Sequence, residues 1–323
     1  MELKPEILNR IKLLDEKFQS MGQDLASYLD GLLYADYLTY WDYIHLDTLL
    51  SLQTPKTQIP DEEIFIMYHQ ITELYFKLCL LEYNQLAEKE NLDAKFLTNR
   101  ISRINRYFDA LISSFDIMVD GMDPQQFLKF RMSLLPASGF QSGQYRMIEI
   151  CSTTFIHLVA KDVRDTFAEQ NLSDDDTIKK MYEHIYWKAG ATELATGKKT
   201  LTLIQFEEKY QKQLLELAQK FKNTNLWSLY KTLPEAEQQD EKLKLALRQM
   251  DVNVNINWPL SHYKSAVRYL QKDPEDIAAT GGTNWQKYLP PRFQKRIFYP
   301  ELWSESELAE WGKNWVASVV FNK

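Results

Sequence analysis

The sequence predicts an all-α fold, in which long helices surround a large core. The 10 glycines are about 3% of the 323 residues, against roughly 7% in average proteins. A β-sandwich or barrel needs many tight turns, and so few glycines do not supply them. Apolar residues also recur at steps of three and four, the period of a helix packed on one side. Strand-like alternation is confined to DVNVNINW, residues 251–258, which is too short to found a sheet.

Length and charge narrow the class of protein further. A chain of 323 residues fits one large helical domain with or without a smaller lobe. The net charge of -7 repels nucleic-acid phosphates and anionic membranes, so we expect neither as a partner. The N-terminal segment mixes acids with apolar residues and predicts neither a signal peptide nor a membrane span, so we expect a cytoplasmic protein. Cys79 and Cys151 lie in apolar helical runs and are expected to be reduced, buried thiols.

The individual helices follow from start signals and apolar spacing. The first is expected at 5–19, and a long one at 61–90 begins after Pro60 and carries Ile64, Met67, Ile71, Leu74 and Leu78 on one side. The clearest stripe follows in 97–118, formed by Leu97, Ile101, Ile104, Phe108, Leu111, Phe115 and Met118. Further helices are expected at 140–160, 174–188, 203–222, 234–249, 259–272 and 305–318. The dense charge of 207–244 predicts a solvated lobe.

Among the five histidines, His69 has the most unusual setting. Phe65, His69 and Phe76 share one helical face, so the spacing predicts an imidazole between two aromatic rings. On the neighbouring stripe, Glu73 and Lys77 are four residues apart, and an ion pair within the helix explains both charges without any function. A hydrogen-bonded structural histidine is the commoner alternative for His69.

His262 is the second candidate, in the segment NWPLSHYKSAVRYL. Pro259 suits a first helical turn, and Ala266, one turn beyond the histidine, leaves room for a flat group. A neutral imidazole that projects from a helix into an apolar slot is the usual ligand of haem iron. A structural histidine remains the alternative here as well.

Arg131 lies with Phe127 in a strongly apolar helical segment, where a guanidinium needs an anionic partner. A buried structural acid or a substrate carboxylate bound by two parallel hydrogen bonds fits equally. Downstream, Ser138 and Gln141 match a capping box, which explains PASGFQ without a ligand. The glycines after Thr280 allow either a close approach to a ligand or a simple turn.

Four segments, taken in order, resemble the tryptophan 2,3-dioxygenase family. They are LTYWDYIHLDTLLSLQ (38–53), IFIMYHQITELYFK (64–77), FRMSLLPASGFQSGQYRMIE (130–149) and HYKSAVR (262–268). The likeness covers most of residues 35–150 and 258–290. PASGFQS with an upstream arginine and HQxxELxFK are its most specific parts.

The resemblance implies a role for each matching residue. His262 is the proximal ligand of the haem iron, and His69 is the distal residue that hydrogen-bonds the indole nitrogen. The other implied substrate contacts are Phe65 and Phe127 beside the indole, Arg131 on the carboxylate, Ser138 in the distal pocket and Thr280 over the ammonium group. Tyr40, Tyr43 and Ile44 match positions that reach a neighbouring subunit's pocket, which implies an obligate homo-oligomer, typically a tetramer.

The implied reaction is the cleavage of the indole C2–C3 bond of L-tryptophan by dioxygen to N-formylkynurenine, as in the kynurenine pathway. The implied cofactor is haem b with ferrous iron, and the partners are L-tryptophan or a close indole analogue. The organisation expected from the resemblance is one continuous haem domain. Residues 1–160 form the arm and the core with the distal pocket, 161–250 a lobe covering haem, and 251–323 the proximal helix, closing loop and C-terminal helix.

Two departures from the family pattern bear on the substrate. KDPEDIAA (272–279) takes the place of a short glycine-rich link before Thr280, and Tyr75 replaces the usual tryptophan of ELWFK. A related haem enzyme that oxygenates a different or modified indole in secondary metabolism is therefore the alternative function. A non-catalytic haem sensor or helical scaffold is the third.

Overall fold

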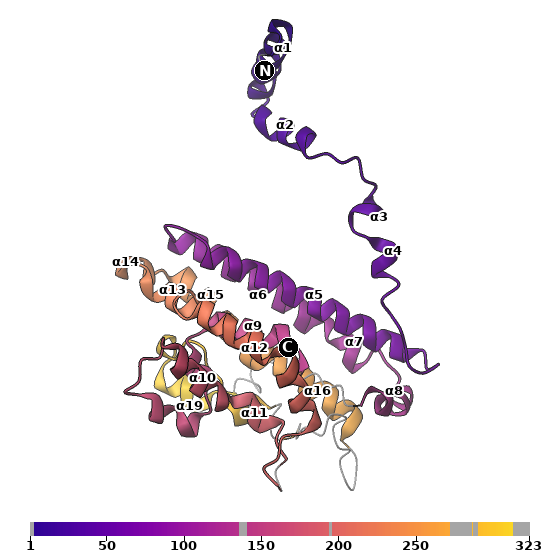
Figure 1. Cartoon of the computed structure of the whole chain (residues 1–323), viewed down its shortest axis with the longest axis vertical. Helices are drawn as coiled ribbons and strands as arrows, with labels where there is room; N and C mark the ends of the chain where they lie inside the picture. The colour runs from indigo at the N-terminus through magenta and orange to yellow at the C-terminus, as the bar shows by residue number, and fades with distance from the viewer. Residues whose placement is uncertain (1–2, 136–140, 194–195, 272–285, 287–289, 313–323) are drawn as a thin grey trace. The chain divides into compact units, whose positions relative to one another are not determined.

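The chain is helical throughout the part that the structure describes (Figure 1). This computed structural model describes residues 3–135, 141–193, 196–271, 286 and 290–312. Within these ranges no β-strand forms, although isolated bridges join Val159 to Ile185 and Thr192 to Lys199. The predicted all-α class is confirmed. None of the helices in these ranges is long and apolar enough to cross a membrane.

The chain divides into two compact units, residues 1–54 and 55–323. The first carries α1 (Pro5–Ser20), α2 (Leu25–Leu33), α3 (Tyr40–Tyr43) and α4 (Leu46–Leu49). The helix expected at 5–19 is confirmed. Asp24 caps α2 by accepting hydrogen bonds from the backbone N–H groups of Ala26 and Ser27, which explains why α2 begins there. The predicted division at 160 and 250, with a lobe that covers haem, stays a prediction.

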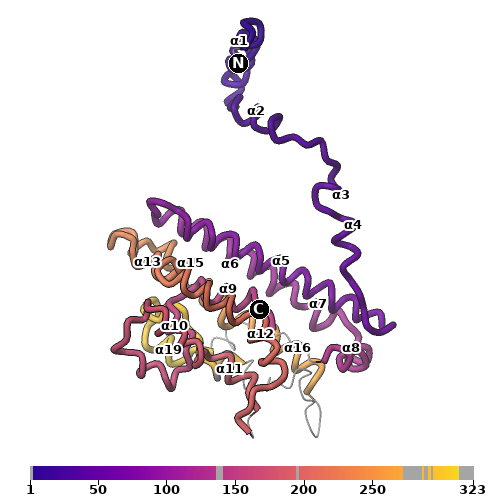
Figure 2. The backbone as a smooth tube through the Cα atoms, viewed as in Figure 1, coloured from indigo at the N-terminus to yellow at the C-terminus, as the bar shows by residue number. Residues whose placement is uncertain are grey.

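The second unit contains the long helices, whose order Figure 2 traces along the chain. Its elements are α5 (Asp61–Ala87), α6 (Ala94–Ser114), α7 (Asp116–Val119), α8 (Pro124–Phe130), η1 (Arg131–Leu134), α9 (Gly143–Ser152), η3 (Phe155–Leu158), η4 (Lys161–Phe167), α10 (Asp175–Glu183), α11 (Tyr186–Gly190), α12 (Leu201–Phe221), α13 (Leu226–Thr232), α14 (Glu235–Gln238), α15 (Glu241–Val252), η5 (Asn253–Asn257), α16 (Trp258–Leu270), α18 (Pro291–Gln294), η6 (Pro300–Leu302) and α19 (Glu305–Glu310). Helix α5 packs against α6 and α9, α15 against α6, and α12 against α9.

The predicted stripe on α6 forms the centre of the core. Leu97, Ile101, Ile104, Phe108 and Leu111 have no exposed surface. Burial of each such side chain stabilises the fold by about 1.5 to 3 kcal/mol. The periodicity of the sequence therefore located this face of the helix correctly.

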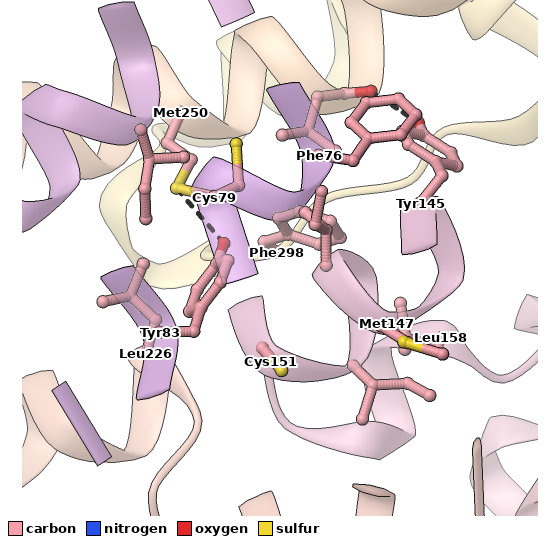
Figure 3. Packing of buried hydrophobic residues seen from close by; sticks show 14 of the residues in the cluster. Phe76, Cys79, Tyr83, Tyr145, Met147, Cys151, Leu158, Leu226, Met250 and Phe298 are labelled. Carbon is pink, nitrogen blue, oxygen red and sulfur yellow. Dashed lines mark hydrogen bonds between the residues drawn. The ribbon is translucent and has the colours of Figure 1, made fainter. Parts of the chain in front are cut away.

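Helix α5 contacts the core through a different face from the predicted apolar stripe. Its buried side chains include Tyr68, Phe76 and Tyr83, which Figure 3 shows in part beside Cys79. The stripe residues Met67, Ile71, Leu74 and Leu78 keep 38 to 49% of their surface exposed. Both cysteines are buried free thiols, as expected.

The segment DVNVNINW is helical, although its alternation resembles a strand. Residues Asn253–Asn257 form the π-helix η5 between α15 and α16. Its asparagines form side-chain hydrogen bonds: Asn253 accepts from Asn257 at 2.9 Å and donates to Asp109 at 3.0 Å, and Asn255 donates to Asp251 at 2.7 Å. The π-turn changes the helical phase, so the apolar residues and the asparagines of this alternating segment are both buried.

Candidate active site

His69 projects from α5 in one defined tautomer. Its Nδ1 lies 2.7 Å from the carbonyl oxygen of Phe65, and because a carbonyl only accepts, Nδ1 must carry the proton. The lone pair of Nε2 therefore remains available. The ring of Phe65 lies 4.1 Å away and that of Tyr68 6.3 Å away, perpendicular to the imidazole. The expected pair of flanking rings is thus present, but the second ring is Tyr68 instead of Phe76.

His262 has the same arrangement on α16. Its Nδ1 donates to the carbonyl oxygen of Trp258 at 3.1 Å, which again leaves the lone pair of Nε2 available. The rings of Phe115 and Trp258 each lie 4.6 Å from the imidazole. Burial lowers the pKa of His262 to about 4, so the ring is neutral near pH 7. A neutral imidazole with a free Nε2 is the form that ligates a metal.

The two imidazoles are close enough for the charge of one to affect the pKa of the other. Burial is the main cause of the low pKa of His262. The hydrogen bond to Trp258 raises this pKa, and a positive charge on His69 would lower it further. Burial likewise lowers the pKa of His69. The ring of Phe115 lies 5.6 Å from that of Tyr68, the residue before His69, and 4.6 Å from that of His262. His69 on α5 and His262 on α16 are therefore both neutral near pH 7, and their roles in a site stay a prediction.

An aromatic wall adjoins His69. The ring of Phe127 on α8 lies 6.4 Å from Phe65, 5.5 Å from Phe130 and 4.5 Å from Tyr269. Arg131 follows directly in η1 and is 5% exposed. Burial lowers the pKa of its guanidinium, but an arginine stays charged near pH 7. Phe65 on α5 therefore contacts α8 through Phe127 and Phe130, and Arg131 is the next residue of the chain.

The remaining predicted site residues belong either to undescribed segments or to the N-terminal unit. Ser138 and Thr280, with the predicted capping box, lie outside the described residues. Tyr40 and Tyr43 belong to α3 of the N-terminal unit and are 71% and 75% exposed, while Ile44 is the C-cap of α3 and is partly buried.

Glu73 has other partners than the expected Lys77. Its carboxylate accepts a hydrogen bond from the Ser142 hydroxyl at 2.7 Å and from the Gln144 amide at 2.7 Å. The same amide nitrogen also donates to the backbone oxygen of Glu73 at 2.9 Å. An ion pair within α5 is therefore the wrong explanation for this charge.

Two site features were not predicted from the sequence. Trp258 supplies the carbonyl that fixes the tautomer of His262, and Phe115 packs on that imidazole. The first had a signal, because a helical histidine reaches the carbonyl four residues earlier. The second did not, because Phe115 belongs to another helix and its position depends on tertiary packing.

Comparison with known proteins identifies relatives over most of the chain. A family model described as tryptophan 2,3-dioxygenase matches residues 33–226. The tryptophan 2,3-dioxygenase of Ruegeria sp. (strain TM1040) is 40% identical over 129 residues, which are 40% of this chain and 44% of that protein. That of Bacillus anthracis is 41% identical over 115 residues, which are 35% of this chain and 40% of that protein. These matches therefore span less than half of either relative. The tryptophan 2,3-dioxygenase of Bradyrhizobium diazoefficiens is 27% identical over 273 residues, 82% of this chain and 91% of that protein.

Proposed function

Since the chain belongs to the tryptophan 2,3-dioxygenase family, we propose that it cleaves the indole C2–C3 bond of L-tryptophan with dioxygen to give N-formylkynurenine. The observation that carries the proposal is the pair of neutral histidines, His69 and His262, each with Nδ1 bonded to a carbonyl and Nε2 available. One imidazole serves as a ligand and the other as a hydrogen-bond acceptor.

The residues around His262 fit haem b. A haem needs a neutral axial imidazole whose second nitrogen has an acceptor, within an apolar and aromatic environment. The second nitrogen of His262 has its acceptor in the carbonyl oxygen of Trp258. The rings of Phe115 and Trp258 supply the aromatic environment. When bound with ferrous iron, haem supplies the activation of dioxygen.

The chain's own residues bind and orient the substrate in this proposal. Nε2 of His69 accepts the hydrogen bond of the indole N–H, because Nδ1 already donates to Phe65. Arg131 binds the substrate carboxylate, and Phe65 and Phe127 flank the indole. Fixing both ends of tryptophan restricts the approach of its ring and supplies the orientational part of the rate. Ser138 in the distal pocket and Thr280 over the ammonium group complete the proposed contacts.

We also propose a homotetramer in the cytoplasm, in which Tyr40, Tyr43 and Ile44 reach a neighbouring subunit's pocket. The exposed rings of Tyr40 and Tyr43 on α3 support a contact surface there, because large aromatic groups in water favour burial at interfaces.

One experiment tests the reaction and the substrate separately. The purified protein is reduced, loaded with haem and given L-tryptophan under labelled dioxygen, and the products are identified by mass spectrometry. A Soret band and the incorporation of two oxygen atoms into N-formylkynurenine are expected. Absence of the Soret band contradicts both the enzyme class and a haem sensor, and leaves the helical scaffold. A Soret band without this product, together with one oxygen atom added when a different indole is supplied in place of L-tryptophan, supports the alternative function instead.

A further inference from the structure

Glu73 joins two helices at the turn that follows His69. It lies four residues after His69, so both side chains project from neighbouring turns of one face of α5. Each carboxylate oxygen accepts one hydrogen bond from the start of α9, from Ser142 and from Gln144, both at 2.7 Å. Hydrogen bonds to an ionised acceptor are about twice as strong as neutral ones. Glu73 therefore joins the start of α9 firmly to α5, the helix that carries His69.

The start of α9 is held from the opposite side as well. Ser142 caps α9 by accepting from the Tyr145 N–H at 3.3 Å, so the carboxylate of Glu73 lies near the positive end of this helix. A Cβ atom at Gly143 would lie 2.5 to 2.8 Å from the ring of Tyr210, which shows how closely α12 approaches. Gln141 donates to the backbone oxygen of Thr202 at 3.2 Å. The start of α9 is thus fixed between α5 and α12.

In the sequence, Arg131 belongs to a stretch whose two ends, in α8 and at the start of α9, each contact α5, on either side of His69. Its first end packs against Phe65, one turn before the histidine, through the ring of Phe127. Its second end is bound by Glu73, one turn after the histidine. Eight residues of helix separate the two attachment points, about 12 Å at the usual rise. Arg131 lies between them in the sequence.

We propose that Glu73 is a positioning residue for substrate binding: it fixes the start of α9 to α5 and thereby sets the position of the Arg131-bearing segment relative to His69. This inference rests on the proposed function, because it concerns the distance between the groups that hold the two ends of tryptophan. Glu73 itself does not contact the substrate in this arrangement.

The first test replaces the acceptor by an amide. In Glu73→Gln, the new amide has a single oxygen and cannot accept from both Ser142 and Gln144, and the negative charge is lost. We expect KM and the dissociation constant of L-tryptophan from the ferrous haem protein to rise about 10-fold, with kcat changed less than about 3-fold. The exposed Glu63 lies on the same helix, so Glu63→Gln is the matched control and is expected to behave as the wild type.

A second readout does not depend on turnover. Hydrogen exchange of the purified holoprotein is expected to be faster for the backbone amides of 143–146 in Glu73→Gln, and unchanged for those of 97–111 in α6. Adding Gln144→Glu to Glu73→Gln reverses donor and acceptor between the two side chains but loses the bond to the backbone oxygen of residue 73, so it is expected to restore slow exchange and the tryptophan affinity in part. If Glu73→Gln does not fold, Gln144→Met removes the same contact and keeps the charge.

The outcomes separate this inference from the proposed function. If the wild type binds haem but does not cleave L-tryptophan, the proposed function fails, while the exchange data still report on the attachment of α9. If the wild type cleaves L-tryptophan and Glu73→Gln retains its KM and its exchange rates, the role of Glu73 is overturned. An equal loss of haem content, kcat and affinity without rescue also overturns it, since that pattern indicates general misfolding.

Discussion

At the scale of single residues, two similar histidines for which different roles are proposed differ in their surroundings. His69 and His262 are both neutral and both donate Nδ1 to the carbonyl four residues earlier. Their neighbours distinguish them: the rings of Phe115 and Trp258 lie beside His262, whereas His69 adjoins Phe65 and, through it, Phe127 of α8, the helix that Arg131 follows in the chain. An apolar enclosure suits an iron ligand, and an aromatic wall with a cation suits an amino acid that carries an indole.

If His262 is the iron ligand, a small residue in its place leaves a cavity that free imidazole fills. His262→Gly is expected to lower haem affinity by at least about 10-fold, because the axial bond is lost. Millimolar imidazole is expected to restore the Soret band. Absorption spectra with and without imidazole check this, and the exposed His184→Gly is the control. A normal Soret band in His262→Gly without imidazole contradicts the assignment.

The proposed role of Arg131 predicts a loss that depends on the substrate carboxylate. Arg131→Ala is expected to weaken L-tryptophan binding by about 2 to 4 kcal/mol, or about 30-fold to 1000-fold. Tryptamine has no carboxylate, so its affinity is expected to be the same in both proteins. Spectral titration of the ferrous proteins with both ligands measures this. An equal loss for both ligands would assign Arg131 a structural role.

At the scale of elements, the C-terminal segment is attached to the core by polar side chains at several points. The Asp251 carboxylate at the end of α15 accepts hydrogen bonds from the N–H groups of Phe298 and Tyr299 and from the indole N–H of Trp303. The carbonyl oxygen of Phe298 accepts a hydrogen bond from Thr153 at 2.7 Å. The backbone of Phe298 is thus bound on both sides.

The free energy of unfolding is expected to decrease as the pH rises toward about 6, the pKa of Asp251 in the folded protein. Burial raises the pKa of Asp251 to about 6, although its hydrogen bonds act in the opposite direction. Between the unfolded value near 3.8 and about 6, the folded state binds more protons, so stability decreases with pH, by up to about 3 kcal/mol. Asp251→Asn removes this dependence. The difference in unfolding free energy between wild type and variant is therefore expected to narrow from pH 4.5 to pH 7.

His157 makes the comparison with the variant necessary. Its Nδ1 also lies near the carbonyl oxygen of Phe298, and burial lowers its pKa to about 4. The folded state therefore releases a proton that the unfolded state retains, and stability increases with pH between about 4 and 6.5. This contribution is present in both proteins and cancels in the difference. Urea unfolding at several pH values measures the result, and a constant difference contradicts the effect of Asp251.

The elements also show which parts of the fold the sequence determines locally. The stripe on α6 was predictable because one face of a single helix packs against a continuous core. The π-helix at 253–257 was not, because side-chain bonds such as that from Asn253 to Asp109 depend on a residue 144 positions away. Glu73 illustrates the same limit within the site: the local spacing indicated Lys77, whereas its partners, Ser142 and Gln144, come from another helix. The histidines were predicted mainly through the family resemblance.

At the scale of the whole molecule, the two units differ in how much core they contain. The main hydrophobic cluster, from Tyr68 to Tyr299, lies entirely within residues 55–323. In the helices of residues 1–54, Leu25 is the buried residue. A fragment of residues 55–323 is therefore expected to fold and to unfold cooperatively by itself, because it retains the main core. Thermal melts followed by circular dichroism check this.

The fragment makes the proposed arm exchange testable by complementation. If Tyr40, Tyr43 and Ile44 complete a neighbouring subunit's pocket, residues 55–323 alone are expected to cleave L-tryptophan at less than about one tenth of the wild-type rate, since part of the substrate's environment is missing. Full-length Arg131→Ala keeps the arm and loses the carboxylate contact. Mixed oligomers are formed by co-expression and selected by different tags on the two chains. They combine the intact pocket of the fragment with the intact arm of the variant. Activity above the sum of the separate proteins is expected from them. A fragment that is fully active alone, or mixed oligomers that show only that sum, would mean that each pocket is complete within one chain.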